Sequence, residues 1–142
     1  MGGGGLYGTA VDYLKFVRMV LNRGRAGAEQ VLKPETVDLM SRNAMGDIQV
    51  RMLQTVAPAL SNDAEFFPGM PKGWGLSFMI NYEQAPTGRS AGSLAWAGLA
   101  NTYFWIDPTR ELGGVYATQI FPFADEKSLP LFFEFEKAVY QD

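Results

Sequence analysis

The sequence predicts an α+β domain: an antiparallel sheet of about four strands, a C-terminal helix packed on it, and two N-terminal helices. Three observations indicate this class. Apolar residues recur at helical spacing near both ends of the chain. They alternate with small or polar residues over residues 73–82. The apolar segments that follow are joined by connections too short for a crossover helix. The 142 residues suffice for a single domain, 1–142, with a sizeable core.

The first helix is expected to begin after Thr9, because Thr9 and Asp12 match a capping box. Gly24 supplies the left-handed residue that ends it. One face of this helix is apolar and recurs every three or four positions: Ala10, Leu14, Val17 and Leu21.

A second helix opens at residues 33–35, with Pro34 preset at the first helical position and Glu35 near the positive end of the helix dipole. It is expected to fade by Asn43. From residue 44 to residue 71 no period lasts, and proline and glycine punctuate a long irregular segment of a kind often associated with function.

Residues 73–82 read as one half-buried strand. Beyond a loop at residues 86–92, further strands are predicted by their apolar patterns at residues 93–98, 102–106 and 114–121, the last two joined by a turn at residues 107–110. A final helix starts near Leu129, since Pro130 is tolerated only in a first turn. Its phenylalanines are expected to lie on the sheet, while Glu134 and Glu136 face solvent.

Composition excludes several classes of function. The net charge is −3 and no cluster of Lys and Arg occurs, so neither nucleic acid nor an anionic membrane is an expected partner. The chain has no Cys and no His, which removes thiolate catalysis, Ser-His-Asp chemistry and His-ligated metals. We expect no metal and no cofactor. No export signal is visible, so a cytoplasmic location is expected.

Residues 88–92 match the G-x-S-x-G pattern of a nucleophile elbow. An elbow needs a strand before it, a helix after it and a His, and here a loop precedes and a strand follows. Ser90 is therefore not expected to be a nucleophile. No serine has a lysine three residues on, and no Tyr-x-Asn occurs, so the His-free Ser-Lys arrangement is also missing. A hydrolase that uses Ser90 or Ser93 with a distant lysine remains a third alternative.

Residues 93–103 surround Trp96 with small residues, which predicts a strand that something approaches closely. A packed neighbour and a ligand are both open at this point. If it is a ligand, the strand would contribute backbone, because an amide N–H at its edge can stabilise a developing oxyanion.

Residues 2–16, 32–40, 96–108 and 118–125 resemble, in order, the C-terminal third of the serine β-lactamase-like hydrolases, and among them the class C-like carboxylesterases. The resemblance implies a partial β-lactamase/transpeptidase-like fold in a larger, two-domain parent. In that family the catalytic Ser-x-x-K and Tyr-x-Asn motifs lie upstream, and this sequence contains neither.

The resemblance also implies roles on the third motif of the family. Trp96 takes the position of the lysine in Lys-Thr-Gly, which favours esters over a carboxylate-bearing β-lactam. Ala97 replaces the usual Thr or Gly, Gly98 completes the motif, and the backbone N–H of Leu99 completes the oxyanion hole. The expected site is thus Leu99 as catalytic donor, with Trp96, Ala97 and Gly98 binding a small-molecule ester.

We expect the chain to be the C-terminal piece of such an enzyme and to be inactive alone. Its expected partner is the missing N-terminal segment or a second copy of itself, because an apolar sheet face and an unpaired edge would otherwise be exposed. The alternative is a non-catalytic oligomeric or binding module that retains part of the fold.

Overall fold

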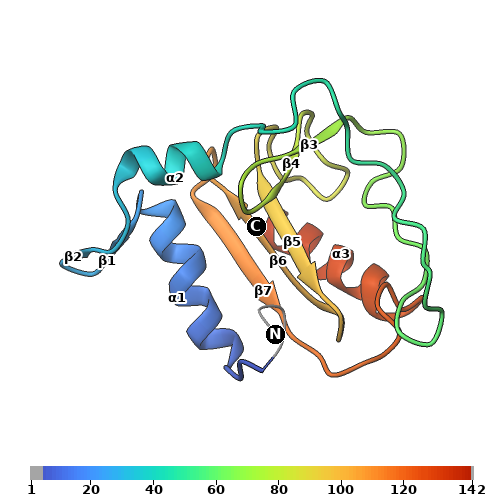
Figure 1. The fold of residues 1–142 in the computed structure, drawn as a ribbon. Helices are drawn as coiled ribbons and strands as arrows, with labels where there is room; N and C mark the ends of the chain where they lie inside the picture. Colours follow the sequence, from blue (N-terminus) through green and yellow to red (C-terminus); the bar gives the residue numbers. More distant parts are fainter. Residues whose placement is uncertain (1–4, 142) are drawn as a thin grey trace.

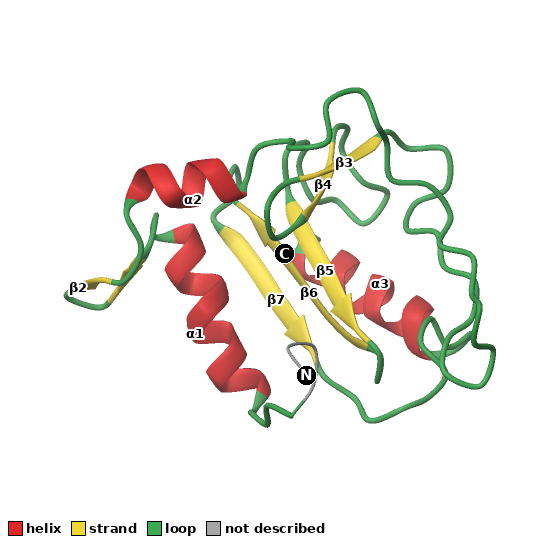
Figure 2. Ribbon diagram, viewed as in Figure 1, coloured by secondary structure: helices red, strands yellow, loops and turns green. Residues whose placement is uncertain are grey.

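A computed structural model describes residues 5–141 and places three helices about a five-stranded antiparallel sheet (Figures 1 and 2). The sheet order follows the chain, β3-β4-β5-β6-β7. The helices are α1 (Ala10–Leu21), α2 (Pro34–Met40) and α3 (Ser128–Val139). The strands of this sheet are β3 (Lys72–Trp74), β4 (Met79–Asn81), β5 (Leu94–Gly98), β6 (Thr102–Asp107) and β7 (Leu112–Tyr116). A separate hairpin pairs β1 (Arg25–Ala26) with β2 (Glu29–Gln30). The α+β class and the antiparallel sheet are confirmed, with one strand more than expected.

The additional strand arises because residues 73–82 do not form one strand. The chain turns back at residues 75–78, where Gly75 N–H donates to Phe78 O at 2.8 Å, and β3 pairs with β4. A Cβ on Gly75 would overlap the carbonyl oxygen of Met40, so the turn lies directly against the end of α2. The alternation of large and small residues was therefore a wrong indicator of one continuous strand here.

The start of α1 agrees with the capping prediction. Thr9 Oγ1 accepts a hydrogen bond from Asp12 N–H at 3.1 Å, and the same hydroxyl donates to the Asp12 carboxylate at 2.8 Å. Gly24 has φ +89° beyond its end. The buried face is rotated from the predicted one, since Val17 and Val20 are buried while Ala10 is exposed.

The sheet is covered on both faces. Helix α1 packs one face, where Val17 and Val20 meet Phe104 and Ile106. Helix α3 covers the other, behind the sheet in Figure 1, where the Phe132 ring stacks on Tyr103 with centroids 4.7 Å apart. This confirms that the phenylalanine-rich helix lies on the sheet.

The expectation that Glu136 faces solvent is wrong. Glu136 is fully buried on α3, and its Oε1 lies 2.6 Å from Nε of Arg89, which is 1% exposed. Arg89 Nη2 donates to the second carboxylate oxygen at 2.9 Å, and the Thr87 hydroxyl donates to the first at 2.7 Å. The inner face of α3 rests on the loop at residues 85–92 as well as on the sheet, so this carboxylate meets a guanidinium instead of water.

The predicted turn at residues 107–110 is built around the buried side chain of Asp107. One carboxylate oxygen accepts from the amides of Thr109 and Arg110, both at 3.0 Å. The other accepts from Ser90 N–H at 2.8 Å and from the Tyr140 hydroxyl at 3.0 Å. Burial by itself would raise the pKa of Asp107, but these donors outweigh it and hold the pKa below its ordinary value.

This arrangement makes part of the stability dependent on pH. A carboxyl whose pKa is lower in the folded chain stabilises the fold above its unfolded pKa, about 3.9, and that contribution is lost as the pH falls through the folded pKa. We expect Asp107→Asn to lower the free energy of unfolding at pH 7 by about 2 kcal/mol and to flatten its decline below pH 4. Urea unfolding at pH 7, 5 and 3, followed by tryptophan fluorescence, measures both. Asp47→Asn, at an exposed position, is the control, and equal slopes for Asp107→Asn and the parent chain would contradict the prediction.

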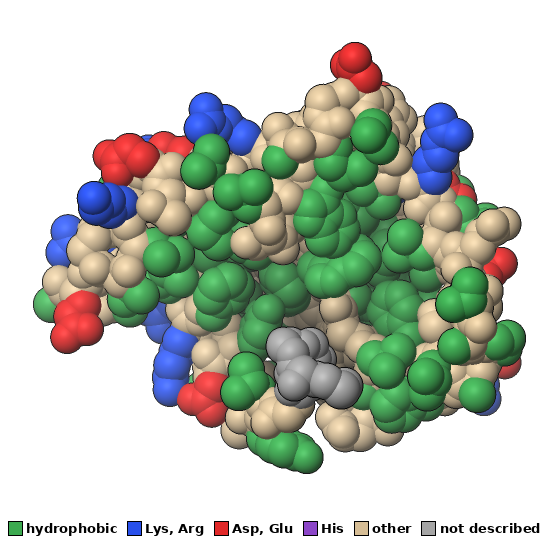
Figure 3. All heavy atoms as spheres, viewed as in Figure 1, with side chains coloured by type: hydrophobic (Ala, Val, Ile, Leu, Met, Phe, Trp, Pro, Cys, Tyr) green, Lys and Arg blue, Asp and Glu red, His purple; other side chains and the backbone are tan. Residues whose placement is uncertain are grey.

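Apolar side chains spread across the face of the molecule seen in Figure 3, between the α1–α2 side and the segment at residues 44–71. Among the described residues, exposed large apolar side chains include Ile48, Met52, Val56, Leu76 and Leu99. Among the described helices, none is long and apolar enough to cross a membrane.

Candidate functional site

Strand β5 has an open edge beside the residues singled out in the sequence. Strand β6 pairs with all of Leu94–Gly98, whereas β4 pairs only with Leu94 and Ala95. Among the residues that the structure describes, the backbone of residues 96–98 therefore has a hydrogen-bonded neighbour on one side only. Such an edge is available to a ligand or to another chain.

The backbone groups at this edge follow from the ladder. Asn81 N–H donates to Ser93 O at 3.3 Å, so the carbonyl of Ser93 faces β4, while its N–H donates to Ser90 O. Two residues on, Ala95 is the ladder partner of Met79 in β4. Successive residues of a strand turn their N–H and C=O to opposite sides. Ala97 therefore faces the open edge, and the same alternation brings Leu99, the first residue of the following turn, to that side. Among residues 5–141, none accepts a hydrogen bond from Leu99 N–H, and Leu99 is 49% exposed.

At this end of β5, the Trp96 side chain packs against other rings, and Gly98 has no side chain. The indole of Trp96 stands edge-on to that of Trp74, with centroids 4.3 Å apart, and lies 6.2 Å from the ring of Phe66. Gly98 is paired with Thr102, and an added Cβ would lie 3.7 Å from the Cβ of Thr102. Trp96 thus packs against neighbouring rings, as one interpretation of this stretch predicted, while β4 leaves the backbone of residues 96–98 unpaired on its side.

The turn that follows Leu99 is held by Asn101, a residue that sequence reasoning missed. Asn101 is fully buried and has φ +57°. Its amide nitrogen donates to the carbonyls of Ile120 and Pro122, and its Oδ1 accepts from the Tyr103 hydroxyl and from Asp125 N–H. An Asn in a tight turn often has a positive φ, so this backbone angle could have been predicted from the sequence. Its four hydrogen-bond partners lie outside the turn, and the residues next to Asn101 in the sequence do not indicate them.

A second contact ties the same turn to the chain beyond β7. The predicted strand at residues 114–121 ends at Tyr116, and the Thr118 hydroxyl donates to Ala100 O at 2.7 Å. Ile120 N–H also donates to Ala100 O. Because residues 118–125 reach back in this way, the position of Leu99 depends on a segment about twenty residues further along the chain.

The serines proposed as alternative nucleophiles are engaged in local structure. Ser90 gives its amide to Asp107, and the Ser93 hydroxyl donates to Ser90 O at 2.8 Å. The buried amine of Lys72 donates to the carbonyls of Phe67 and Met70, and burial lowers its pKa. Within the described part of the chain, no hydrogen bond joins a serine hydroxyl to a lysine.

Across residues 5–141, no group of three or more His, Cys, Asp or Glu side chains is placed to hold an ion. The chemistry that the strand edge offers is hydrogen-bond donation from backbone.

Comparisons with known proteins give a consistent family. The family model described as Beta-lactamase matches residues 1–132. The chain is 35% identical over 127 residues to Protein Rv1367c of Mycobacterium tuberculosis (strain H37Rv), an alignment that covers 84% of this chain and 29% of that protein.

Solved structures give the same result. Unliganded simvastatin synthase (LovD) from Aspergillus terreus superposes with a TM-score of 0.67 and 25% identity, over 90% of this chain and 33% of that one. A β-lactamase-like protein of Bacteroides dorei DSM 17855 gives a TM-score of 0.60 and 29% identity, over 88% of this chain and 35% of that one. The chain thus spans about a third of the length of the proteins it resembles.

Proposed function

The chain belongs to the β-lactamase family, and on this premise we propose that it forms the oxyanion-stabilising wall of a serine hydrolase that acts on esters. Leu99 N–H is the donor. Trp96, Ala97 and Gly98 line the substrate beside it. When a serine oxygen attacks the ester carbonyl, the electron pair of the C=O bond moves to oxygen, and the Leu99 amide donates to the negative charge that forms there.

One observation carries this proposal: the N–H of Leu99 lies at an open strand edge and has no partner among the described residues. A single preorganised donor of this kind contributes about 10²–10³ in kcat in well-studied hydrolases. The contacts that Asn101 and Thr118 make with neighbouring segments support it, because a donor must be fixed before the reaction to be effective.

An ester is favoured over a β-lactam by the residue that stands at position 96. By resemblance, β-lactamases place a lysine there, whose ammonium can bind the carboxylate of the lactam. Here the position holds an indole packed against Trp74 and Phe66, and β5 carries no cation that would replace the ammonium.

The nucleophile and its base are not supplied by this sequence. The family takes them from Ser-x-x-K and Tyr-x-Asn motifs, and residues 1–142 contain neither. We propose that the chain alone does not react with a fluorophosphonate probe and that activity requires a segment bearing those motifs.

The test removes only the proposed donor. Joined to a segment of a family member that bears the Ser-x-x-K and Tyr-x-Asn motifs, the chain is expected to hydrolyse 4-nitrophenyl butyrate. Leu99→Pro deletes the N–H and is expected to lower kcat by about 10²–10³, whereas Leu99→Ala keeps the N–H and stays within about threefold of the parent. Steady-state kinetics measure both.

A second variant separates chemistry from misfolding. Replacement of Leu99 by its α-hydroxy acid, through semisynthesis, exchanges the N–H for an oxygen and keeps the side chain. The same loss of kcat with an unchanged unfolding midpoint supports the donor. Equal rates for this variant and the parent would refute it.

The rival function is a non-catalytic oligomeric or binding module that keeps the fold without its chemistry. The exposed apolar residues described above favour this function, because a partner chain bound over them would remove their apolar surface from water. The joined protein discriminates between the two, since a module without catalytic function would show no hydrolysis in any variant and would form the same oligomers with or without the added segment.

A further inference from the structure

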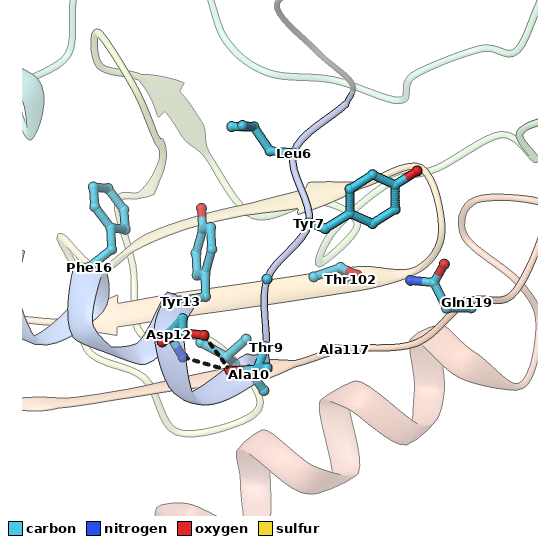
Figure 4. Close-up of a pocket in the computed structure, with 12 residues that line it drawn as sticks. Leu6, Tyr7, Thr9, Ala10, Asp12, Tyr13, Phe16, Thr102, Ala117 and Gln119 are labelled. Carbon is cyan, nitrogen blue, oxygen red and sulfur yellow. Dashed lines mark hydrogen bonds between the residues drawn. The ribbon is translucent and has the colours of Figure 1, made fainter.

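A pocket of about 520 Å³ lies on the α1 face of the sheet, at the end where β6 begins. Figure 4 shows its walls. Leu6 and Tyr7 come from the segment before α1, Tyr13 and Phe16 from the helix itself, and Thr102 and Gln119 from the sheet side. Residues 6–16 thus meet residues 102–119, which are distant in the sequence, around one pocket.

The pocket and the proposed oxyanion donor are connected through one pair of residues on neighbouring strands. Thr102, which lines it, is the ladder partner of Gly98, and Gly98 immediately precedes Leu99. Because Gly98 has no side chain, nothing on β5 stands over Thr102 at this point. A carbonyl held by the Leu99 N–H lies at the other edge of β5, so a substituent on it would reach the pocket by crossing β5 at Gly98, where no side chain stands in the way.

The residues that line the pocket also indicate which chemical groups it can bind. It is predominantly apolar and aromatic, and the Tyr13 ring is itself fixed by contact with Phe104, with centroids 5.2 Å apart. No lysine or arginine lines the pocket. The one charged group in its wall, Asp12, already binds the Thr9 hydroxyl and, at 2.7 Å, the Lys15 ammonium.

An anion would therefore leave water for a site whose nearby cation, the Lys15 ammonium, is already paired with the Asp12 carboxylate, which is unfavourable. A neutral chain of several carbons would instead remove apolar surface from water, at about 0.8 kcal/mol for each CH₂ group buried. The hydroxyl of Thr102 and the side-chain oxygen of Gln119, whose amide nitrogen donates to Thr118 O, can each make one hydrogen bond to a polar atom on such a group.

We propose that this pocket binds the uncharged, apolar group of the ester substrate, and that it discriminates against carboxylate-bearing molecules. This assignment rests on the proposed function for its place in the reaction. Binding itself needs neither the serine nor the Leu99 amide, so it is tested on the 142-residue chain as it is.

The experiment is a titration of the ¹⁵N-labelled chain with methyl hexanoate and, separately, with sodium hexanoate, followed by amide chemical shifts. The ester is expected to cause saturable shifts at Tyr7, Tyr13, Thr102 and Gln119, and hexanoate to bind at least tenfold more weakly. Equal affinity for the two ligands, or shifts spread over the exposed apolar face without saturation, would overturn the proposal.

A filling variant checks the location. Ala117 lines the pocket and is exposed, so Ala117→Trp is expected to occupy the cavity and weaken ester binding at least tenfold. Ala59→Trp adds the same side chain at an exposed position in the 44–71 segment and is expected to leave binding unchanged. Unaltered binding in Ala117→Trp would place the ligand elsewhere.

The two proposals can fail separately. If the ester does not bind but the Leu99 variants lose activity, the donor stands and the pocket assignment is wrong. If the ester binds as described but the Leu99 variants keep full activity, the pocket stands and the oxyanion assignment is wrong.

Discussion

Glu136→Ala is expected to lower the free energy of unfolding by about 3–5 kcal/mol, the usual cost of removing one partner from a buried ion pair. The substitution leaves the guanidinium of Arg89, which is 1% exposed, without its carboxylate. The Thr87 hydroxyl loses its acceptor as well. Because a typical domain is stable by only 5–15 kcal/mol, the variant is expected to be partly unfolded at 37 °C. Urea unfolding monitored by tryptophan fluorescence measures the loss.

Two further variants show whether the loss of stability comes from the ion pair. Glu134→Ala changes an exposed carboxylate on the same helix and is expected to stay within about 0.5 kcal/mol of the parent. In the double variant Arg89→Met with Glu136→Leu both charges are gone, and it is expected to regain most of the lost stability. A loss for Glu136→Ala no larger than that for Glu134→Ala would show that the ion pair does not stabilise the fold.

Asn101→Ala is expected to cost a similar amount, about 3–5 kcal/mol, for a different reason. Alanine leaves the Tyr103 hydroxyl and the amide of Asp125 without their acceptor, and two carbonyls without their donor. It also places a Cβ-bearing residue that disfavours φ +57° in that conformation, at about 1 kcal/mol. Thermal and urea unfolding measure the sum.

Asn101→Gly separates the two contributions, because glycine accepts the backbone angle but makes none of the four hydrogen bonds. We expect it to recover about 1 kcal/mol relative to Asn101→Ala and no more. Amide hydrogen exchange gives a second readout, since exchange at residues 99–101 should accelerate in both variants. Parent-like stability in Asn101→Gly would mean that the side chain does not hold this turn.

Much of the fold was predictable because it depends on local patterns. The cap at Thr9, the proline at the start of α2 and the turn around Asp107 are short-range features, and all three occur as predicted. The central strands β5 and β6 are continuous apolar runs whose limits differ from the prediction by at most one residue.

What could not be predicted depends on partners distant in the sequence. The turn at residues 75–78 exists because α2 passes beside Gly75, and Glu136 is buried because Arg89, 47 residues earlier, lies opposite. The spacing of apolar residues along the sequence does not depend on whether α2 lies beside Gly75 or Arg89 lies opposite Glu136, so it could predict neither contact. At the candidate site, the motif around Trp96 was visible in the sequence, while the supporting contacts of Asn101 required the structure.

The strand order β3-β4-β5-β6-β7 has a consequence for how the molecule folds. Each strand pairs with the next along the chain, so the sheet can grow by successive hairpins. The connections β3–β4, β5–β6 and β6–β7 are short and close at small entropic cost, whereas the β4–β5 connection, residues 82–93, is longer. Helix α3 comes last in the chain, and its ion pair needs the loop at residues 85–92 already in place. We therefore expect the hairpins to form early and α3 to dock late, so that damage at Glu136 mainly accelerates unfolding and leaves the folding rate nearly unchanged.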